Sequence, residues 1–392
     1  MATAIIPGVQ YSGIWTMQQV NAAIAAGTWP VGSPNSLYGW GSNSFGQAGL
    51  GNTTLTSSPT LVSADTWSSL ALTSNSNALH NLSIKKNGTL WGWGYNYRGQ
   101  LGLGNTTYYS SPKQIGSLTN WAKVSTGNTT TLAIKTDGTL WAWGQNNYGQ
   151  LGLGNLTDYS SPKQVGALTN WASVSGGAYY SLAIKTDGTI WSWGYGVDGA
   201  LGLNNLTSYS SPKQVGSLTT WLKIAAGYAN SFAIKTDGTA WCWGRSDVGQ
   251  LGLGNRTTYS SPKQIGALTD WATISSGARG TSFAGFTLAV KTSGTLWSWG
   301  NNITGMLGIG NTTSYSSPKQ VGSLTSWSQV VAGASSSFSI KTDGTLWAWG
   351  RNGQRELGLG NATNYSSPKQ VGSLTSWLQV AAGYYAGVGI TS

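Results

Sequence analysis

The pattern of apolar and polar positions in residues 132–143 predicts two β-strands joined by a tight turn. Leu132 and Ile134 alternate with their neighbours, which is the two-residue period of a strand with one apolar face. Residues 140–143, Leu-Trp-Ala-Trp, are apolar without a break, as expected for a strand buried on both faces. The segment therefore predicts the inner hairpin of an antiparallel sheet.

The turn between these strands contains Asp137-Gly138, a pair that favours a two-residue hairpin turn. We expect the type I′ turn, in which both central residues have positive φ. The same position recurs along the chain as Asp187-Gly188, Asp237-Gly238, Asp343-Gly344, Asn87-Gly88 and Ser293-Gly294.

Two further strands flank each hairpin. Residues 221–225 (Trp-Leu-Lys-Ile-Ala) precede one hairpin, and residues 212–215 (Pro-Lys-Gln-Val) follow another. Proline at the start of the last strand suits a sheet edge, where a missing backbone donor is tolerated. Each unit is therefore predicted to be a four-stranded antiparallel sheet, with strands A to D in chain order.

This unit is repeated seven times. The second Trp of its Trp-x-Trp-Gly core is Trp40, Trp93, Trp143, Trp193, Trp243, Trp299 or Trp349, at intervals of 53, 50, 50, 50, 56 and 50 residues. In the first copy Tyr38 replaces the first Trp. A strand-rich repeat of about 50 residues is typical of propellers and other closed arrays.

The two ends of the chain supply complementary halves of one unit. Residues 37–62 contain strands C and D with nothing before them, and residues 377–391 contain strands A and B with nothing after them. We therefore predict an all-β, seven-bladed β-propeller over residues 37–392, closed by pairing of the C-terminal strands with residues 37–41, which leaves no open sheet edge. The residues expected at the closure are Leu37, Trp40, Trp377, Val380, Val388 and Ile390.

The repeats resemble those of the regulator of chromosome condensation family, whose pattern runs roughly aG-x-x-H-s-l-a-L-t-x-dG-x-v-y-x-W-G-x-n-x-x-G-q-L-G-l-g. The resemblance covers about residues 37–392 and implies the propeller fold. The member that gives the family its name is an exchange factor for a nuclear GTPase, so the resemblance also implies nucleotide exchange. The acidic exchange surface and most of the repeated His positions have no match here, because only His80 is retained.

Composition limits the function classes. Only 8% of residues are charged and 22 are Trp, and most Trp residues occupy repeated positions that indicate packing between blades. The net charge of +11 comes largely from repeated lysines in two sets, which we expect to be spread around the ring for solubility and edge protection. This distribution argues against a nucleic-acid partner. One set is Lys85, Lys135, Lys185, Lys235, Lys291 and Lys341, and the other is Lys113, Lys163, Lys213, Lys263, Lys319 and Lys369.

Sequence variation between repeats is concentrated in the A–B and C–D loops. In a four-stranded blade both loops emerge on the same side of the disc, so one face should gather Tyr, Asn and Arg side chains suited to recognition. The alternative is that these are ordinary tolerant surface loops. The candidate recognition residues are Tyr95, Tyr97, Arg98, Tyr148, Tyr179, Tyr180, Tyr195, Tyr228, Asn230, Arg245, Arg279, Arg351, Tyr384 and Tyr385.

The inventory of catalytic groups is small: one His, one Cys and one Glu. His80 and Cys242 are interpreted as packed residues, the turn aspartates as turn formers, and the Leu-Gly-Leu-Gly-Asn runs as structural turns. The Asn-x-Thr sequence that follows the Gly-rich run in each of the seven repeats, such as that at Asn155, is interpreted as an Asn turn. We therefore expect no catalytic residues, no metal site and no cofactor.

Residues 1–36 lie outside the repeats and are treated as a separate attachment segment. A short helix is expected over residues 17–26, capped by Thr16 and ended by Gly27. Residues 11–30 resemble a segment of bacteriophage virion proteins, tail proteins especially. The segment lacks the pattern of a secretory leader, and no stretch is long and apolar enough to span a membrane. The residues proposed for attachment are Trp15, Met17, Val20, Ile24 and Trp29.

The leading hypothesis from the sequence is a non-enzymatic display module on the surface of a bacteriophage particle. It would bind other virion proteins through residues 1–36 and a host surface protein or glycan through its loops. The first alternative is an intracellular, cytoplasmic exchange factor or regulatory scaffold of the chromosome condensation type. The second alternative is a carbohydrate-binding lectin that uses aromatic side chains.

Overall fold

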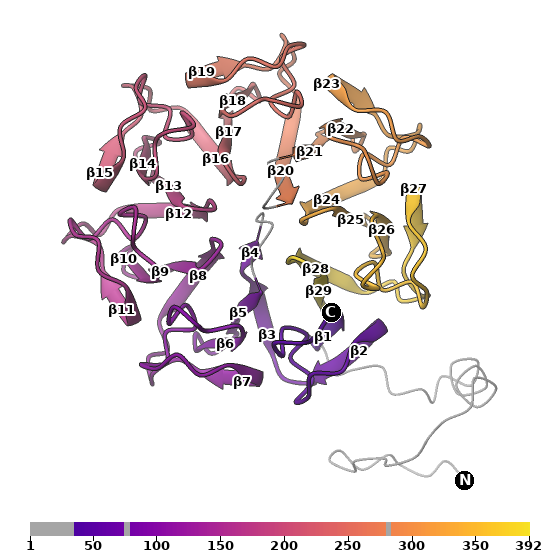
Figure 1. Ribbon diagram of the computed structural model, residues 1–392, viewed down its shortest axis with the longest axis horizontal. Helices are drawn as coiled ribbons and strands as arrows, with labels where there is room; N and C mark the ends of the chain where they lie inside the picture. The colour runs from indigo at the N-terminus through magenta and orange to yellow at the C-terminus, as the bar shows by residue number, and fades with distance from the viewer. Residues whose placement is uncertain (1–34, 74–78, 280–283) are drawn as a thin grey trace.

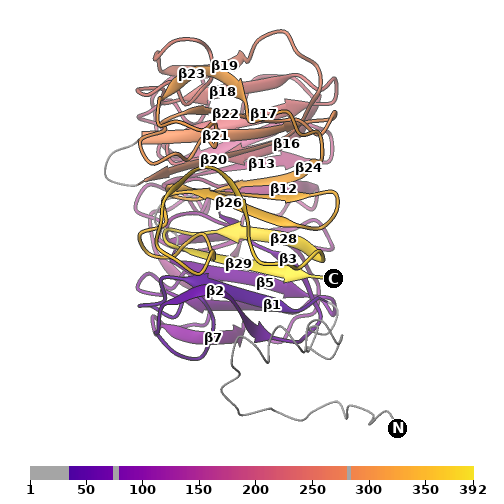
Figure 2. The ribbon, with the colours of Figure 1, turned by 90° about the vertical axis from the view of Figure 1, so that its right-hand side faces the viewer.

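The computed structural model describes residues 35–73, 79–279 and 284–392, and within these ranges every regular element is a β-strand. The strands form seven sheets arranged as a closed ring around a central axis (Figure 1). Figure 2 shows the ring from the side, with the strands crossing the thickness of the disc. The predicted seven-bladed propeller is therefore confirmed.

One blade illustrates the arrangement. From the axis to the rim it contains β8 (Trp121–Thr126), β9 (Thr130–Lys135), β10 (Leu140–Gly144) and β11 (Tyr159–Gln164), all antiparallel. Leu140 pairs with Ile134, as the alternation of apolar positions predicts. A short additional strand from the preceding blade, β4 (Leu72–Thr73), pairs in parallel with β8. This strand was not expected from the sequence.

Five other blades repeat this order. They are β3 (Trp67–Leu70), β5 (His80–Lys85), β6 (Leu90–Gly94) and β7 (Tyr109–Gln114); β12 (Trp171–Gly176), β13 (Tyr180–Lys185), β14 (Ile190–Gly194) and β15 (Tyr209–Gln214); β16 (Trp221–Ala226), β17 (Asn230–Lys235), β18 (Ala240–Gly244) and β19 (Tyr259–Gln264); β20 (Trp271–Arg279), β21 (Ala284–Lys291), β22 (Leu296–Gly300) and β23 (Tyr315–Gln320); and β24 (Trp327–Ala332), β25 (Ser336–Lys341), β26 (Leu346–Gly350) and β27 (Tyr365–Gln370).

The seventh blade joins the two ends of the chain. It contains β28 (Trp377–Ala382), β29 (Ala386–Thr391), β1 (Leu37–Gly41) and β2 (Thr56–Ser63). Strands β1 and β29 are antiparallel, with Leu37 opposite Ile390 and Gly39 opposite Val388. All six residues predicted at the closure are buried, with at most 3% of their surface exposed: Leu37, Trp40, Trp377, Val380, Val388 and Ile390. The predicted closure is confirmed.

The turns between strands B and C differ from the prediction of type I′ geometry. Gly138 has φ 76°, but Asp137 is not among the non-glycine residues with positive φ in the described ranges. Gly138 N donates to Lys135 O at 3.0 Å, which is a type I turn followed by a left-handed glycine. The Asp137 carboxylate accepts hydrogen bonds from Thr139 N at 2.9 Å and from the Thr139 hydroxyl at 2.7 Å. These bonds stabilise Asp137 in its negative-φ conformation.

The second Trp of each repeat joins neighbouring blades. Trp143 is fully buried and its Nε1 donates to Gln100 O of the preceding blade at 2.9 Å. Trp193 makes the same bond to Gln150 O at 2.9 Å. Both the apolar ring and the polar N–H of this residue are therefore used between blades, which confirms the packing role expected for these Trp residues.

The hairpin lysines contradict the expectation that both lysine sets serve solubility. Lys135 is 7% exposed, and its Nζ lies 3.7 Å from the ring centroid of Trp141 and 5.0 Å from that of Trp121. The two rings contact each other edge to face, with centroids 6.1 Å apart. Cation–π attraction thus holds the ammonium group between two Trp rings inside six of the seven blades. In the closing blade the corresponding positions are Thr391 and Tyr38. By contrast, Lys113 and its copies lie exposed on the outer strands, as expected.

Gly138→Ala should destabilise the protein far more than Gly166→Ala. Both glycines have positive φ, 76° and 61°, so a methyl group strains either backbone by about 1 kcal/mol. A Cβ at residue 138 would also lie 2.1 Å from the backbone O of Thr169, whereas nothing lies within 4 Å of a Cβ at residue 166. We expect a loss of about 3 kcal/mol for Gly138→Ala. Equal losses by denaturant unfolding would contradict this contact.

Candidate functional site

The A–B and C–D loops lie on one side of the disc, as predicted. Gln145 N, at the start of a C–D loop, donates to Thr129 O of the A–B loop at 2.9 Å. The B–C hairpins and D–A connections lie on the opposite side, where Trp171 N donates to Gly138 O of the preceding hairpin at 3.1 Å. We call these two sides the loop face and the hairpin face.

The C–D loops are held in place by buried amide side chains. Asn146 is fully buried; its Nδ2 donates to Asn155 O at 3.0 Å and its Oδ1 accepts from Leu151 N at 2.9 Å. The Asn155 side chain accepts from Thr157 N at 3.0 Å, which confirms the interpretation of the Asn-x-Thr sequences as Asn turns. The loop residues on this face are therefore presented by an ordered backbone.

A first aromatic cluster lies over the first two C–D loops. Tyr95 contacts Tyr108 and Phe45, with ring centroids 4.8 and 5.2 Å away. Tyr97 is 59% exposed and stacks on Tyr95, while the Arg98 guanidinium lies 5.2 Å from the Tyr97 ring. Burial, followed by the hydrogen bond with Tyr108, raises the pKa of Tyr95 to about 12. Tyr95 therefore remains an uncharged phenol at neutral pH.

A second cluster joins three blades. Tyr148 contacts Tyr195 and Tyr179 edge to face, at centroid distances of 4.9 and 5.3 Å. Tyr179 also contacts Tyr228 at 6.1 Å, and Tyr148 is 41% exposed. Edge-to-face contacts favour a fixed arrangement of rings. The four residues form a continuous aromatic surface, which we call the tyrosine cluster.

Charged groups lie beside the tyrosine cluster. Arg245 pairs with Asp247 at 2.5 Å and with Asp198 at 3.9 Å. Burial raises the pKa of Asp198, and the Arg245 charge opposes that shift. Burial, followed by repulsion from Asp198, raises the pKa of Tyr195. The tyrosine cluster and the charged side chains beside it therefore combine phenols, carboxylates and a guanidinium. Together they can bind both cationic and hydrogen-bonding groups of a partner.

A third group lies next to the ring closure. Tyr384 and Tyr385 are in contact, with centroids 3.9 Å apart, and the Arg351 guanidinium lies 4.4 Å from the Tyr385 ring. Arg351 also pairs with Glu356 at 3.4 Å. The structure thus distributes most of the predicted recognition residues among three groups on one face.

Two predicted recognition residues are not on the surface. Tyr180 is 2% exposed and its hydroxyl donates to Asn230 O at 2.6 Å; Asn230 is itself 2% exposed. Each is the first residue of a B strand, where the side chain points between blades, so the expectation that they are exposed is wrong. The Arg279 side chain and the attachment residues Trp15, Met17, Val20, Ile24 and Trp29 lie outside the described residues.

Sequence reasoning missed Phe45, Tyr108, Asp158 and Asp198 on this face. Asp158 accepts from Asn146 N at 2.7 Å and pairs with Arg98 at 3.4 Å. Tyr108 and Asp158 occupy the same position of successive repeats. The signal that could have identified Tyr108 and Asp158 was variation at this one position of a loop that is otherwise nearly constant between repeats.

The two faces carry very different charges. Strand order places all fifteen lysines and six aspartates at the hairpin face, and the six arginines, three aspartates and one glutamate at the loop face. The net charge is therefore +9 on one side and +2 on the other. The expected spread of the lysines around the ring is found. Across the disc they gather on one side, because each repeat places its lysines at the same end of its strands.

The described residues contain no group of three or more His, Cys, Asp or Glu side chains arranged to hold a metal ion. His80 is fully buried with Nε2 3.3 Å from the Thr131 hydroxyl oxygen, and burial lowers its pKa to about 3. Cys242 is buried, which raises the pKa of its thiol. Within the described ranges no helix is long and apolar enough to cross a membrane.

Comparison with protein families gives matches in every blade. A model described as the regulator of chromosome condensation (RCC1) repeat matches residues 35–69, 87–134, 137–184, 187–234, 237–284, 293–340 and 343–390. Mouse protein RCC2 is 33% identical over 105 residues, which are 26% of this chain and 20% of that protein. The chain thus matches about a fifth of the length of this relative.

Solved structures share the fold. Human WBSCR16 superposes with a TM-score of 0.80 at 21% identity, covering 92% of this chain and 99% of that one. Prp20p from Saccharomyces cerevisiae, whose structure was described with its binding to Gsp1p and histones, gives 0.78 at 21% identity and covers 92% of both chains. At this identity the likeness shows the fold alone. None of these matches supports the predicted virion role.

Proposed function

Because the chain belongs to the family of regulator of chromosome condensation (RCC1) repeat proteins, we propose that it is a non-enzymatic, regulatory protein-binding module whose loop face holds the partner. The observation that carries this proposal is the tyrosine cluster, four contacting rings beside Arg245, Asp198 and Asp247 on ordered loops. Tyr and Arg are enriched among residues that dominate binding energy at protein interfaces.

The expected result is that disruption of the tyrosine cluster weakens partner binding without unfolding the ring. A partner would be captured on the immobilised chain, identified and purified, and its affinity measured by calorimetry. Tyr179→Ala and Tyr228→Ala together should weaken binding about 100-fold, since each residue acts as a central aromatic contact. The matched control is Lys163→Ala with Lys213→Ala on the hairpin face. Equal affinity of both variants would refute the proposed face.

Guanine-nucleotide exchange is the more specific form of this proposal. The family membership supports it, although the structural likeness to Prp20p extends only to the fold. It predicts faster release of labelled GDP from a small GTPase in the presence of this chain. Release at the uncatalysed rate across a panel of small GTPases would remove exchange and leave the binding role.

Display on a bacteriophage particle remains a hypothesis that rests on residues 11–30, which lie outside both the family match and the described residues. Mass spectrometry of purified particles would test it, and recovery of the chain only from the soluble cell fraction would count against it.

A further inference from the structure

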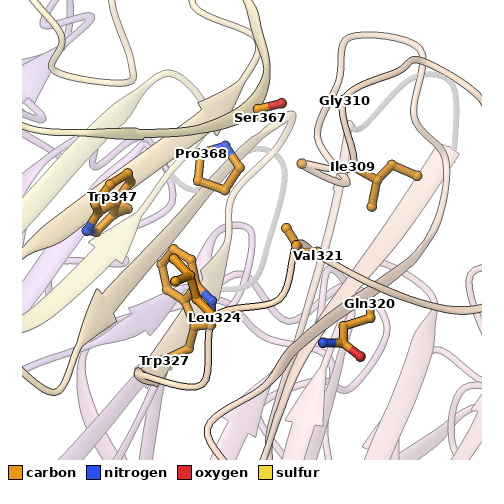
Figure 3. A pocket seen from close by; sticks show the side chains of 11 residues that line it. Ile309, Gly310, Gln320, Val321, Leu324, Trp327, Trp347, Ser367 and Pro368 are labelled. Atoms are coloured by element: carbon orange, nitrogen blue, oxygen red, sulfur yellow. The ribbon is translucent and has the colours of Figure 1, made fainter.

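The outer edge of the ring contains a recurring notch between neighbouring blades. One notch has a volume of about 360 Å³ and is lined from one blade by Ile309, Gln320 and Val321, and from the next by Trp327, Trp347 and Pro368. Figure 3 shows Trp347, Trp327 and Leu324 on one side of this space and Ile309, Val321 and Gln320 on the other. A notch of about 330 Å³ lies at the equivalent position three blades away, lined by Leu153, Gln164, Trp171 and Trp191.

The repeat explains why the notches are equivalent. Both are lined by the same eleven positions of the repeat, with Ile309 in place of Leu153 and Val at residues 165 and 321. Five junctions between neighbouring blades have the same residue types at six positions of this lining. In the first notch these positions are Gln320, Leu324, Trp327, Trp347, Ser367 and Pro368. At the sixth, Tyr38 replaces the second Trp. The chain therefore carries up to five copies of one site around its rim.

The lining defines the chemistry of a ligand. It contains no charged side chain, so an ionic ligand gains nothing there. Two indole rings, Leu324 and Pro368 provide apolar walls. The Gln320 amide and the Ser367 hydroxyl each supply both a donor and an acceptor. Volumes of this size with mostly apolar walls and a few polar groups are typical of small-ligand sites.

Each notch also contains an unsatisfied donor. Trp327 is 3% exposed and Trp171 is 4% exposed, and the Nε1 of each is buried without a hydrogen-bond partner in the structure. A buried N–H without an acceptor is costly. Leu324 is 50% exposed at the mouth of the notch, so a small movement of this side chain can open a path for an acceptor. An aliphatic peptide side chain would leave the donor unpaired, whereas an oxygen-rich ligand would not.

We propose that these rim notches bind neutral saccharides, with the apolar face of a sugar ring against the Trp residues and its hydroxyl and ring oxygens at Gln, Ser and indole N–H. A glycan would bind through several notches at once, which raises its overall affinity. This site is distinct from the loop face and does not depend on the protein partner proposed above.

The test begins with an array of neutral oligosaccharides probed with the full chain, followed by calorimetric titration of the strongest ligand. Replacement of the five notch glutamines by Ala (residues 114, 164, 214, 264 and 320) should lower the affinity at least about tenfold, because each site loses a hydrogen-bonding group. The control replaces the adjacent exposed lysines at 113, 163, 213, 263 and 319 and should bind like the wild type. Leu324→Trp, which fills one notch, should remove one site per chain.

Three results would overturn the proposal. They are failure of every neutral glycan on the array to bind, glycan binding unchanged by the glutamine variant, and capture of peptides but not glycans. Loss of binding in the lysine variant alone would instead assign the ligand to the exposed lysines beside the notches. Persistence of glycan binding in the Tyr179→Ala, Tyr228→Ala variant is expected and separates this site from the loop face.

Discussion

A chain that ends after Ser376 should fail to form a stable ring. The truncation removes β28 and β29, so β1 loses the partner that pairs with all five of its residues. It also removes Trp377, Val380, Val388 and Ile390 from the core. Truncation of one buried Trp alone typically costs about 3–5 kcal/mol, which is a large share of the stability of a domain. We expect aggregation on purification or a cooperative unfolding transition at much lower denaturant concentration.

The control keeps all strands and changes only the place where the chain begins. Thr391 N donates to Ser36 O at 3.1 Å, so the two ends of the ring are adjacent and can be joined by a short linker. New ends between residues 216 and 217 lie in an exposed D–A connection. This circular permutant should fold and unfold like the parent ring. If the truncated chain were as stable as the permutant, closure by the C-terminal strands would not be needed for folding.

Acidification should destabilise the wild type more than it destabilises the His80→Thr variant. The extra loss comes from protonation of His80 in the unfolded chain. Burial lowers the pKa of His80 to about 3, below its usual value of 6.5, so between these values the unfolded chain binds a proton that the folded chain excludes. Stability is therefore highest above pH 6.5 and falls as the pH is lowered towards 3, by up to about 5 kcal/mol. Thr is the matched substitution, because Thr130 occupies this position in the next blade.

The measurement is the free energy of unfolding by urea at pH 7, 5.5 and 4. The difference between wild type and His80→Thr should change steadily across this range. The turn carboxylates do not obscure it, because hydrogen bonds from Thr139 lower the pKa of Asp137 in both proteins alike. Parallel stability curves for the two proteins would show that folding does not lower the pKa of His80.

Repetition explains why so much of the fold was predictable. Seven copies of Trp-x-Trp-Gly, each with the same alternation before it, define strands, blade number and closure without reference to contacts between blades. The position of Trp143 in an apolar run predicts burial, but its bond to Gln100 O depends on how the blades are staggered. The role of the hairpin lysines was misinterpreted for the same reason. The sequence of a single strand does not show that Lys135 lies between two Trp rings.

The candidate site was predicted at the level of loops and only partly at the level of residues. Tyr179 and Tyr180 are adjacent in the sequence, yet Tyr179 joins the tyrosine cluster while Tyr180 is 2% exposed between blades. The difference is set by where the loop ends and β13 begins, which the sequence places only to within a few residues. Asp158 was missed because its role depends on Arg98, sixty residues earlier.

The sequence by itself determined the number of blades, their strand order and the pairing of the chain ends, because these follow from period and local alternation. Only the tertiary structure decided which side chains are exposed, how the +9 and +2 charges divide between the two faces, and that the same notch recurs between blades. These properties arise from contacts between residues about fifty positions apart, and a pattern read along one strand contains no information about what the neighbouring blade places against it.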